Sequence, residues 1–396
     1  MHQFMKIILG FLILSLLTFS CKEKNEPQNK QEKITKSPIE VNVINQNTVK
    51  RNILNQVRSF EFLALKGIPV DKSILKVNKA IEYNGKLLLL DKMRSNLHLF
   101  TLDGDFIKII GVKGDGPEEF KSIKDFSVHK NRNEIIIIDH ESMLIYDLNG
   151  NFKNKVYLGS NLSPNSLSIL DDDHIAFNVR VDSNEYYKIL ITDIHGNVKG
   201  KAAKFPEAGK YLNFEFTGGM NGDGLDTYYN APTSSLVYKI IPPADLLPLY
   251  QLNFGTNTWP ENKKYYHQEF DKEIMNLNTS YLNHSYKITT GWFIFSYTDK
   301  NRNLYGYYNI NNQQVYTSNN INNSQRLIRF LLPVPIGLDS KNRFINSIEF
   351  ETFLSFKSNG NGKFMKDLKN FNLDLFHELD KMNYDNSIIL TFYQLK

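Results

Sequence analysis

Cysteine is almost absent from this sequence, since Cys21 is the single one among 396 residues. A chain with one cysteine forms no internal disulfide, so the apolar core and hydrogen-bonded secondary structure must hold its fold. A large charge excess is also missing, because the formal net charge is only +5. No basic stripe runs along the chain, and this excludes the electrostatic footprint of a nucleic-acid-binding protein.

Recognisable catalytic motifs are missing as well. The chain has no Gly-x-Ser-x-Gly nucleophile elbow and no His-Glu-x-x-His pair of zinc ligands. Its nine histidines are scattered. The sequence therefore predicts no catalytic residue, no metal ligand and no cofactor.

The first twenty residues have the layout of an export signal. The basic start "MHQFMK" precedes the apolar run "IILGFLILSLLTF", which is shorter than the roughly 20 residues of a membrane-spanning helix. Cys21 follows directly, and the segment resembles a bacterial lipoprotein signal peptide, which implies lipid attachment at Cys21. The "KE" after Cys21 resembles the sorting signal of surface lipoproteins in the Bacteroidetes. We therefore expect a signal peptide over 1–20 and a lipid-anchored location at the outer membrane, on either its periplasmic or its cell-surface side.

The next stretch is polar and charged and contains few large apolar residues. Such a composition cannot offset the entropy lost on ordering, so residues 21–50 are predicted to form a flexible tether to the membrane.

A repeat organises the chain beyond this point. Asp103-Gly104, Asn149-Gly150 and His195-Gly196 each lie between alternating apolar runs, and their glycines are 46 residues apart in both steps. Such dipeptides favour tight hairpins because the central residues adopt positive φ. Apolar runs at 84–92 and 133–141 add buried strands upstream. About four strands in 46 residues is typical of a propeller blade.

The repeat predicts an all-β fold, a six-bladed β-propeller over residues 51–396. Blade four is expected over 213–242 and the strand that follows, blade five over 286–318, and blade six from "RLIRFLLPVPIGLDSKNRFINSIEF" to "SIILTFYQLK". The extended run 57–65 is predicted to pair with the last blade and close the ring. Seven blades are the alternative, if blade four contains a split.

Two segments have apolar residues at helical spacing, 261–283 and 363–383. In the second, Phe364, Leu368, Phe371, Leu375 and Leu379 recur at steps of three and four. We expect both to be helical insertions that cap one face of the propeller.

The blocks "LLLLDKMRSNLHLFTLDGDFIKIIGVKGDGPEEF", "DTYYN…SLVYKI" and "DNSIILTFYQLK" resemble the six-bladed β-propeller lipoproteins of the Bacteroidetes, which are related to NHL-repeat propellers. The resemblance covers most of residues 50–396. It implies a lipid-anchored propeller, and related propeller folds include calcium-dependent lactonases and lyases.

Three loops rich in glycine or acidic residues are candidates for chemistry. "GVKGDGPEEF" (111–120) lacks the lysine and hydroxyl residue of a phosphate-binding loop and the alternating oxygens of a calcium loop, so we interpret it as a sharp connection between blades. "LDDDHI" (170–175) and "NGDGLD" (221–226) are interpreted as turns between strands.

Binding is the function that the sequence favours. Exposed polar and aromatic side chains are expected near the ends of inner strands. They combine aromatic surface with hydrogen-bond donors, which suits a glycan, a peptide or a protein ligand. The candidates are Arg94, His140, Arg180, Tyr228 and Tyr229. The alternative is a hydrolase or lyase that uses a divalent cation, calcium for example, in the central channel.

Overall fold

The computed structural model describes residues 37–43, 52–159, 162–179, 187–204, 219–231, 234–259, 279–300, 302–318, 325–359, 362–382 and 388–396. Two compact units divide the chain, Met1–Thr35 and Lys36–Lys396, and every described residue belongs to the second. Cys21, Arg180 and most of the predicted helical segment 261–283 lie outside the described residues. The described remainder of that segment begins strand β21, so its predicted helix does not extend to residue 283.

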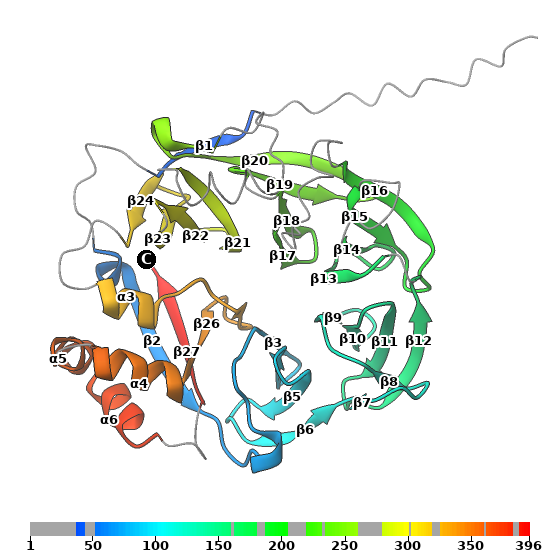
Figure 1. Cartoon of the computed structure of the whole chain (residues 1–396), viewed down its shortest axis with the longest axis horizontal. Helices are drawn as coiled ribbons and strands as arrows, with labels where there is room; N and C mark the ends of the chain where they lie inside the picture. Colours follow the sequence, from blue (N-terminus) through cyan, green and yellow to red (C-terminus); the bar gives the residue numbers. More distant parts are fainter. Residues whose placement is uncertain are drawn as a thin grey trace, which may run out of the picture. The chain divides into compact units, whose positions relative to one another are not determined.

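Six sheets of four or five strands stand around a central axis as the blades of a β-propeller (Figure 1). Blade one is formed by Lys79–Tyr83 (β3), Lys86–Asp91 (β4), Asn96–Thr101 (β5) and Phe106–Ile110 (β6). Blade two is formed by Asp125–His129 (β9), Glu134–Ile138 (β10), Ser142–Asp147 (β11) and Phe152–Tyr157 (β12). Blade three is formed by Pro164–Ile169 (β13), Ile175–Val179 (β14), Tyr187–Thr192 (β15) and Val198–Lys204 (β16).

The second half of the ring follows the same order of strands. Blade four is formed by Gly219–Asp223 (β17), Asp226–Asn230 (β18), Leu236–Ile241 (β19) and Asp245–Asn253 (β20). Blade five is formed by Ser280–Ile288 (β21), Trp292–Asp299 (β22), Arg302–Asn309 (β23) and Gln314–Thr317 (β24). Blade six is formed by Gly337–Leu338 (β25), Phe344–Glu349 (β26), Ile388–Leu395 (β27) and Val57–Ala64 (β2). Short 3-10 turns occur at Ile53–Gln56 (η1), Val70–Lys72 (η2) and Gly255–Asn257 (η4).

The three glycine hairpins are confirmed. Gly104, Gly150 and Gly196 lie in the turns that join the third and fourth strands of blades one to three, with φ of +84°, +74° and +82°. These values lie in the left-handed region, which glycine adopts without the steric cost that a Cβ brings. The predicted buried runs form β4 and β10, whose apolar side chains pack on both faces. Repeat spacing therefore identified the first three blades correctly.

The ring closes through β2, as predicted for residues 57–65. β2 pairs antiparallel with β27, from Val57 opposite Leu395 to Ala64 opposite Ile389. The last blade thus takes its outer strand from the start of the propeller and its other three strands from the end. The closed ring leaves no gap between the first and last blades.

A fifth strand joins blade four inside the stretch predicted as a tether. Ile39–Asn42 (β1) pairs parallel with β20, with Ile39 opposite Tyr250 and Asn42 opposite Asn253. Val41 is fully buried there, so this apolar residue explains the ordering that composition alone did not predict.

The described α-helices lie beside blade six (Figure 1). Lys363–Phe371 (α5) and Leu373–Asp380 (α6) confirm the helical insertion predicted over 363–383. Phe350–Asn359 (α4) precedes them and was not predicted. All three lie between β26 and β27 and pack into one apolar cluster with the last blade.

The predicted start of blade six is wrong. Its first residues form a helix, Gln325–Leu331 (α3), and the innermost strand begins only at Gly337. Leu327, Ile328 and Leu331 lie on the buried side of α3, so the apolar run satisfies a helix as well as a strand. α3 packs between blades five and six, against Trp292 and Ile348 among others.

One end of the ring carries the β4–β5 and β10–β11 turns. We call it the strand-start face, because the innermost strands of the blades begin there. Lys79, which begins β3, pairs with Leu90, so the β4–β5 turn lies on this face. In the same way Asp125 pairs with Ile138, and this places the β10–β11 turn there. An ion pair between Lys79 and Asp125 at 3.2 Å joins the two blades at this end.

The glycine-rich stretch 111–120 connects blade one to blade two, as predicted. Val112–Lys113 (β7) and Glu119–Phe120 (β8) form a small parallel pair within it. The Gly116 amide donates a hydrogen bond to the Glu119 carboxylate at 2.8 Å. The loop's acidic side chain therefore holds the loop itself together.

Candidate functional site

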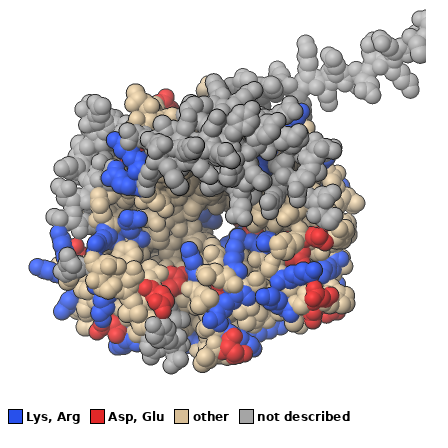
Figure 2. Space-filling view, viewed as in Figure 1, with Lys and Arg blue, Asp and Glu red and all other residues tan. Residues whose placement is uncertain are grey.

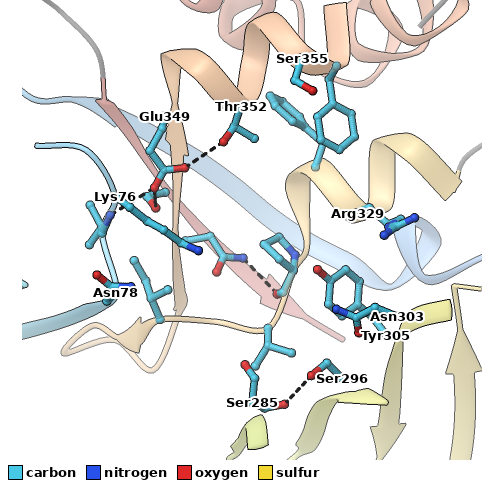
Figure 3. Close-up of a pocket in the computed structure, with 18 of the residues that line it drawn as sticks. Lys76, Asn78, Ser285, Ser296, Asn303, Tyr305, Arg329, Glu349, Thr352 and Ser355 are labelled. Atoms are coloured by element: carbon cyan, nitrogen blue, oxygen red, sulfur yellow. Dashed lines mark hydrogen bonds between the residues drawn. The ribbon is translucent and has the colours of Figure 1, made fainter. Parts of the chain in front are cut away.

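A pocket of about 720 Å³ opens where α3 separates blade five from blade six (Figure 3). Its lining comes from β21, β22 and β23 on one side, and from α3, α4 and β26 on the other. Residues 76–78, which lead into β3 of blade one, close a third side. The size is that of a small-molecule site.

The charged groups of the pocket are mainly cationic. Lys76, Arg326 and Arg329 line it together with a single carboxylate, Glu349. Glu349 already accepts hydrogen bonds from the Val77 amide at 3.3 Å and from the Ser347 hydroxyl at 2.7 Å. The positive charge of the pocket is therefore in excess, and this favours an anionic ligand.

Arg329 is the cation best placed to meet a ligand. Its side chain is exposed, and among the described residues it has no hydrogen-bond or ion-pair partner. Arg326, by contrast, donates to the Asn359 carbonyl, which joins α3 to α4. Burial raises the pKa of Tyr305, and the nearby Arg329 guanidinium partly opposes this rise. The Arg329 guanidinium and the Tyr305 hydroxyl therefore lie close enough in the pocket to interact electrostatically.

Lys76 is presented from a rigid segment. The neighbouring Leu75 amide donates to Asp91 at 2.8 Å, and the Val77 amide donates to Glu349. Asn78 accepts a hydrogen bond from the Lys92 amide at 2.9 Å. Figure 3 shows Lys76 and Asn78 on one side of the pocket and Arg329 on the other.

The uncharged lining is rich in amides and hydroxyls. The polar residues are Asn78, Ser285, Ser296, Asn303, Asn346, Ser347, Thr352, Ser355 and Asn359. Asn346 is buried and donates to the Pro333 carbonyl at 3.3 Å. Tyr305, Phe330 and Phe356 add aromatic surface. Such a combination binds a ligand that carries many hydroxyl groups as well as negative charge.

The residues predicted from sequence lie elsewhere. Arg94 in the β4–β5 turn and His140 in the β10–β11 turn both lie on the strand-start face, but neither lines the pocket. Their role in binding stays a prediction. Arg180 lies outside the described residues.

The expectation that Tyr228 and Tyr229 are exposed is wrong. They lie in β18, a second strand, and expose only 7% and 1% of their surface. Tyr228 belongs to the core that blade four shares with blade five, and Tyr229 to the core shared with blade three. The alternating pattern of a strand sends them to opposite faces, and both faces are buried.

Sequence reasoning missed the pocket itself. Lys76, Ser285 and Arg329 come from three distant parts of the chain, and only the fold brings them together. One usable signal was present, since "RLIRF" places two arginines three residues apart, which is one side of a helix.

The acidic loops carry no metal site in the described part of the chain. Residues 171–173 form the bend between β13 and β14, and residues 224–225 form the turn between β17 and β18, as predicted. Among the described residues, no three His, Cys, Asp or Glu side chains gather in a metal-binding group. Within those same residues, no helix has the length and apolar character needed to cross a membrane.

Comparisons with known proteins place the chain in a family. It belongs to the family described as Domain of unknown function (DUF4934), which matches residues 70–393. No curated protein is similar enough in sequence to match.

One solved structure shows the same fold, and two others are more distantly similar. A Bacteroides fragilis protein described as exported is 18% identical, with a TM-score of 0.72 over 90% of this chain and 99% of its own. A DUF4221-family protein of Bacteroides vulgatus is 9% identical, with a TM-score of 0.48 over 86% of this chain and 97% of its own. Virginiamycin B lyase of Staphylococcus aureus is 10% identical, with a TM-score of 0.38 over 65% of this chain and 73% of its own.

Proposed function

We propose that this member of the DUF4934 family is a non-catalytic binding protein whose pocket between blades five and six holds an acidic carbohydrate. The excess of cations around the pocket carries the proposal. Among the described residues, the side chains of Lys76 and Arg329 have no hydrogen-bond or ion-pair partner, whereas Glu349 is already hydrogen-bonded. A guanidinium binds a carboxylate through two parallel hydrogen bonds, and this makes Arg329 the principal contact.

The neutral part of the lining supports a sugar over other acids. Amides and hydroxyls from β21, β22, β23, β26 and α4 can exchange hydrogen bonds with several sugar hydroxyls. The rings of Tyr305, Phe330 and Phe356 offer apolar surface for the faces of a pyranose.

Binding of galacturonate, with galactose as the neutral counterpart, tests this function. Arg329→Gln is expected to weaken galacturonate binding at least about tenfold, because it removes a charge-assisted pair of hydrogen bonds. Isothermal titration calorimetry measures the change. Arg132→Gln is the matched control, since Arg132 is exposed in the β9–β10 turn at the opposite end of the ring. Equal affinity for the two sugars, or an unchanged affinity in Arg329→Gln, would contradict the proposal.

We also propose that the protein is exported and anchored to the outer membrane by lipid on Cys21. The export-type segment before Cys21 supports this location. Cys21→Ser is expected to move the protein from the membrane fraction to the soluble fraction and to abolish incorporation of labelled palmitate. Membrane retention of the variant would argue against lipid anchoring.

A further inference from the structure

A second cationic centre lies on the strand-start face. Lys79 donates to both carboxylate oxygens of Asp125 at 3.2 Å, and Lys124 directly precedes Asp125. Lys92 lies in the β4–β5 turn on the same face. Asp125 is buried and also accepts a hydrogen bond from the Leu167 amide at 3.0 Å. Lys79 therefore pairs with a carboxylate that is already fully used, and Lys92 and Lys124 add two further lysines at this end of the ring.

Lys79 and Lys124 are close enough to act electrostatically on Lys92. Desolvation lowers the pKa of Lys92, Asp125 opposes the change, and Lys79 and Lys124 lower the pKa further. Like charges held together destabilise one another. An anion placed among them relieves this repulsion, so the cluster is suited to bind one.

The cluster is continuous with the pocket. The Lys92 amide donates to Asn78, and Asn78 itself lines the pocket. Lys76 lies two residues before Asn78, on the segment fixed by Asp91 and Glu349. A ligand that leaves the pocket past Lys76 and Asn78 thus reaches Lys92. In Figure 2, Lys and Arg side chains border the central hollow.

We propose that the ligand is an oligosaccharide with several acidic sugars, in which one carboxylate binds Arg329 in the pocket and another binds the cluster of Lys79, Lys92 and Lys124. This proposal rests on the proposed function, because it assumes that the pocket binds an acidic sugar. Two linked contacts raise affinity more than either alone, since the second forms within the complex.

Galacturonate and tetragalacturonate, titrated calorimetrically into the full chain, separate the two sites. The unmodified protein is expected to bind the tetramer at least about tenfold more tightly than the monomer. The double variant Lys92→Gln/Lys124→Gln is expected to lose about tenfold in affinity for the tetramer and nothing for the monomer. Lys66→Gln is the control for loss of a lysine charge, since its exposed side chain lies beside the β5–β6 turn at the opposite end of the ring.

The outcomes distinguish the two proposals. If the double variant binds the tetramer as tightly as the unmodified protein, the second site is wrong, whatever Arg329→Gln does. If the double variant loses affinity for the monomer and the tetramer equally, the lysines belong to the first site and the proposal of an extended ligand is wrong. If Arg329→Gln leaves both probes unaffected, or neither probe binds, the proposed function itself fails. Far-UV circular dichroism of each variant confirms that the fold is intact.

Discussion

His284 shows how burial in an innermost strand changes the pKa of a single residue. It lies in β21 one position before Ser285 of the pocket, and its carbonyl accepts a hydrogen bond from the Asn221 side chain at 3.1 Å. Burial lowers the pKa of His284 to about 4, and the positive charge of Lys188 adds to the effect. The folded protein therefore keeps this imidazole neutral under conditions in which an unfolded chain protonates it.

The pH dependence of stability follows from that shift. An unfolded histidine has a pKa of about 6.5, so as pH falls from about 6.5 to about 4 the unfolded state binds a proton that the folded state refuses. Above about pH 6.5 His284 is neutral in both states and costs no stability. As pH falls through this window, its protonation in the unfolded state lowers the free energy of unfolding by up to about 3 kcal/mol. Urea unfolding at a series of pH values is expected to show a shallower decrease for His284→Gln. Parallel curves for the two proteins would contradict the assignment.

At the scale of elements, α3 is responsible for the pocket. This helix packs into the core shared by blades five and six and also lines the pocket. Its apolar side chains belong to that core, and its arginines line the pocket. A helix in this position supplies both the space for a ligand and the charge that attracts it.

The difference between the repeated blades and the unrepeated helix α3 explains what the sequence could predict. The hairpins at Gly104, Gly150 and Gly196 repeat at a fixed spacing, and local turn chemistry determines them. α3 has no repeat partner, and its short apolar run fits a strand equally well. The pocket depends on α3 and on contacts between distant segments, so only the family of folds was predictable and the site was not.

The whole propeller depends on the closure of blade six, and Arg343 reinforces it. Its guanidinium donates to Asp339 at 2.6 Å and also to Glu61 of the closing strand β2. It lies over the Phe392 ring of β27, with 5.1 Å between the guanidinium carbon and the ring centre. The side chain of Asp339 is 1% exposed, so its charge depends on this partner for compensation. One side chain thereby joins the N-terminal and C-terminal strands of the ring.

Loss of this contact should weaken the entire ring. Arg343→Ala is expected to lower the free energy of unfolding by about 3 kcal/mol, because it leaves a buried carboxylate unpaired. Glu61→Gln is the matched control, and since Glu61 is largely exposed its loss should cost less than about 1 kcal/mol. Urea unfolding followed by tryptophan fluorescence and by circular dichroism measures both. A loss confined to one of the two signals would show that the blades unfold separately.

The parallel pairing of β1 with β20 has a mechanical consequence. β1 precedes the closing strand β2 in the chain and is held on blade four by four paired residues and by the bond from the Val43 amide to the Asn253 carbonyl. A pulling force applied at the N-terminus therefore loads β1 before it reaches β2. We expect the short strand β1 to detach from β20 first. The released segment then extends under the force, so the longer strand β2 that closes the ring stays under low tension.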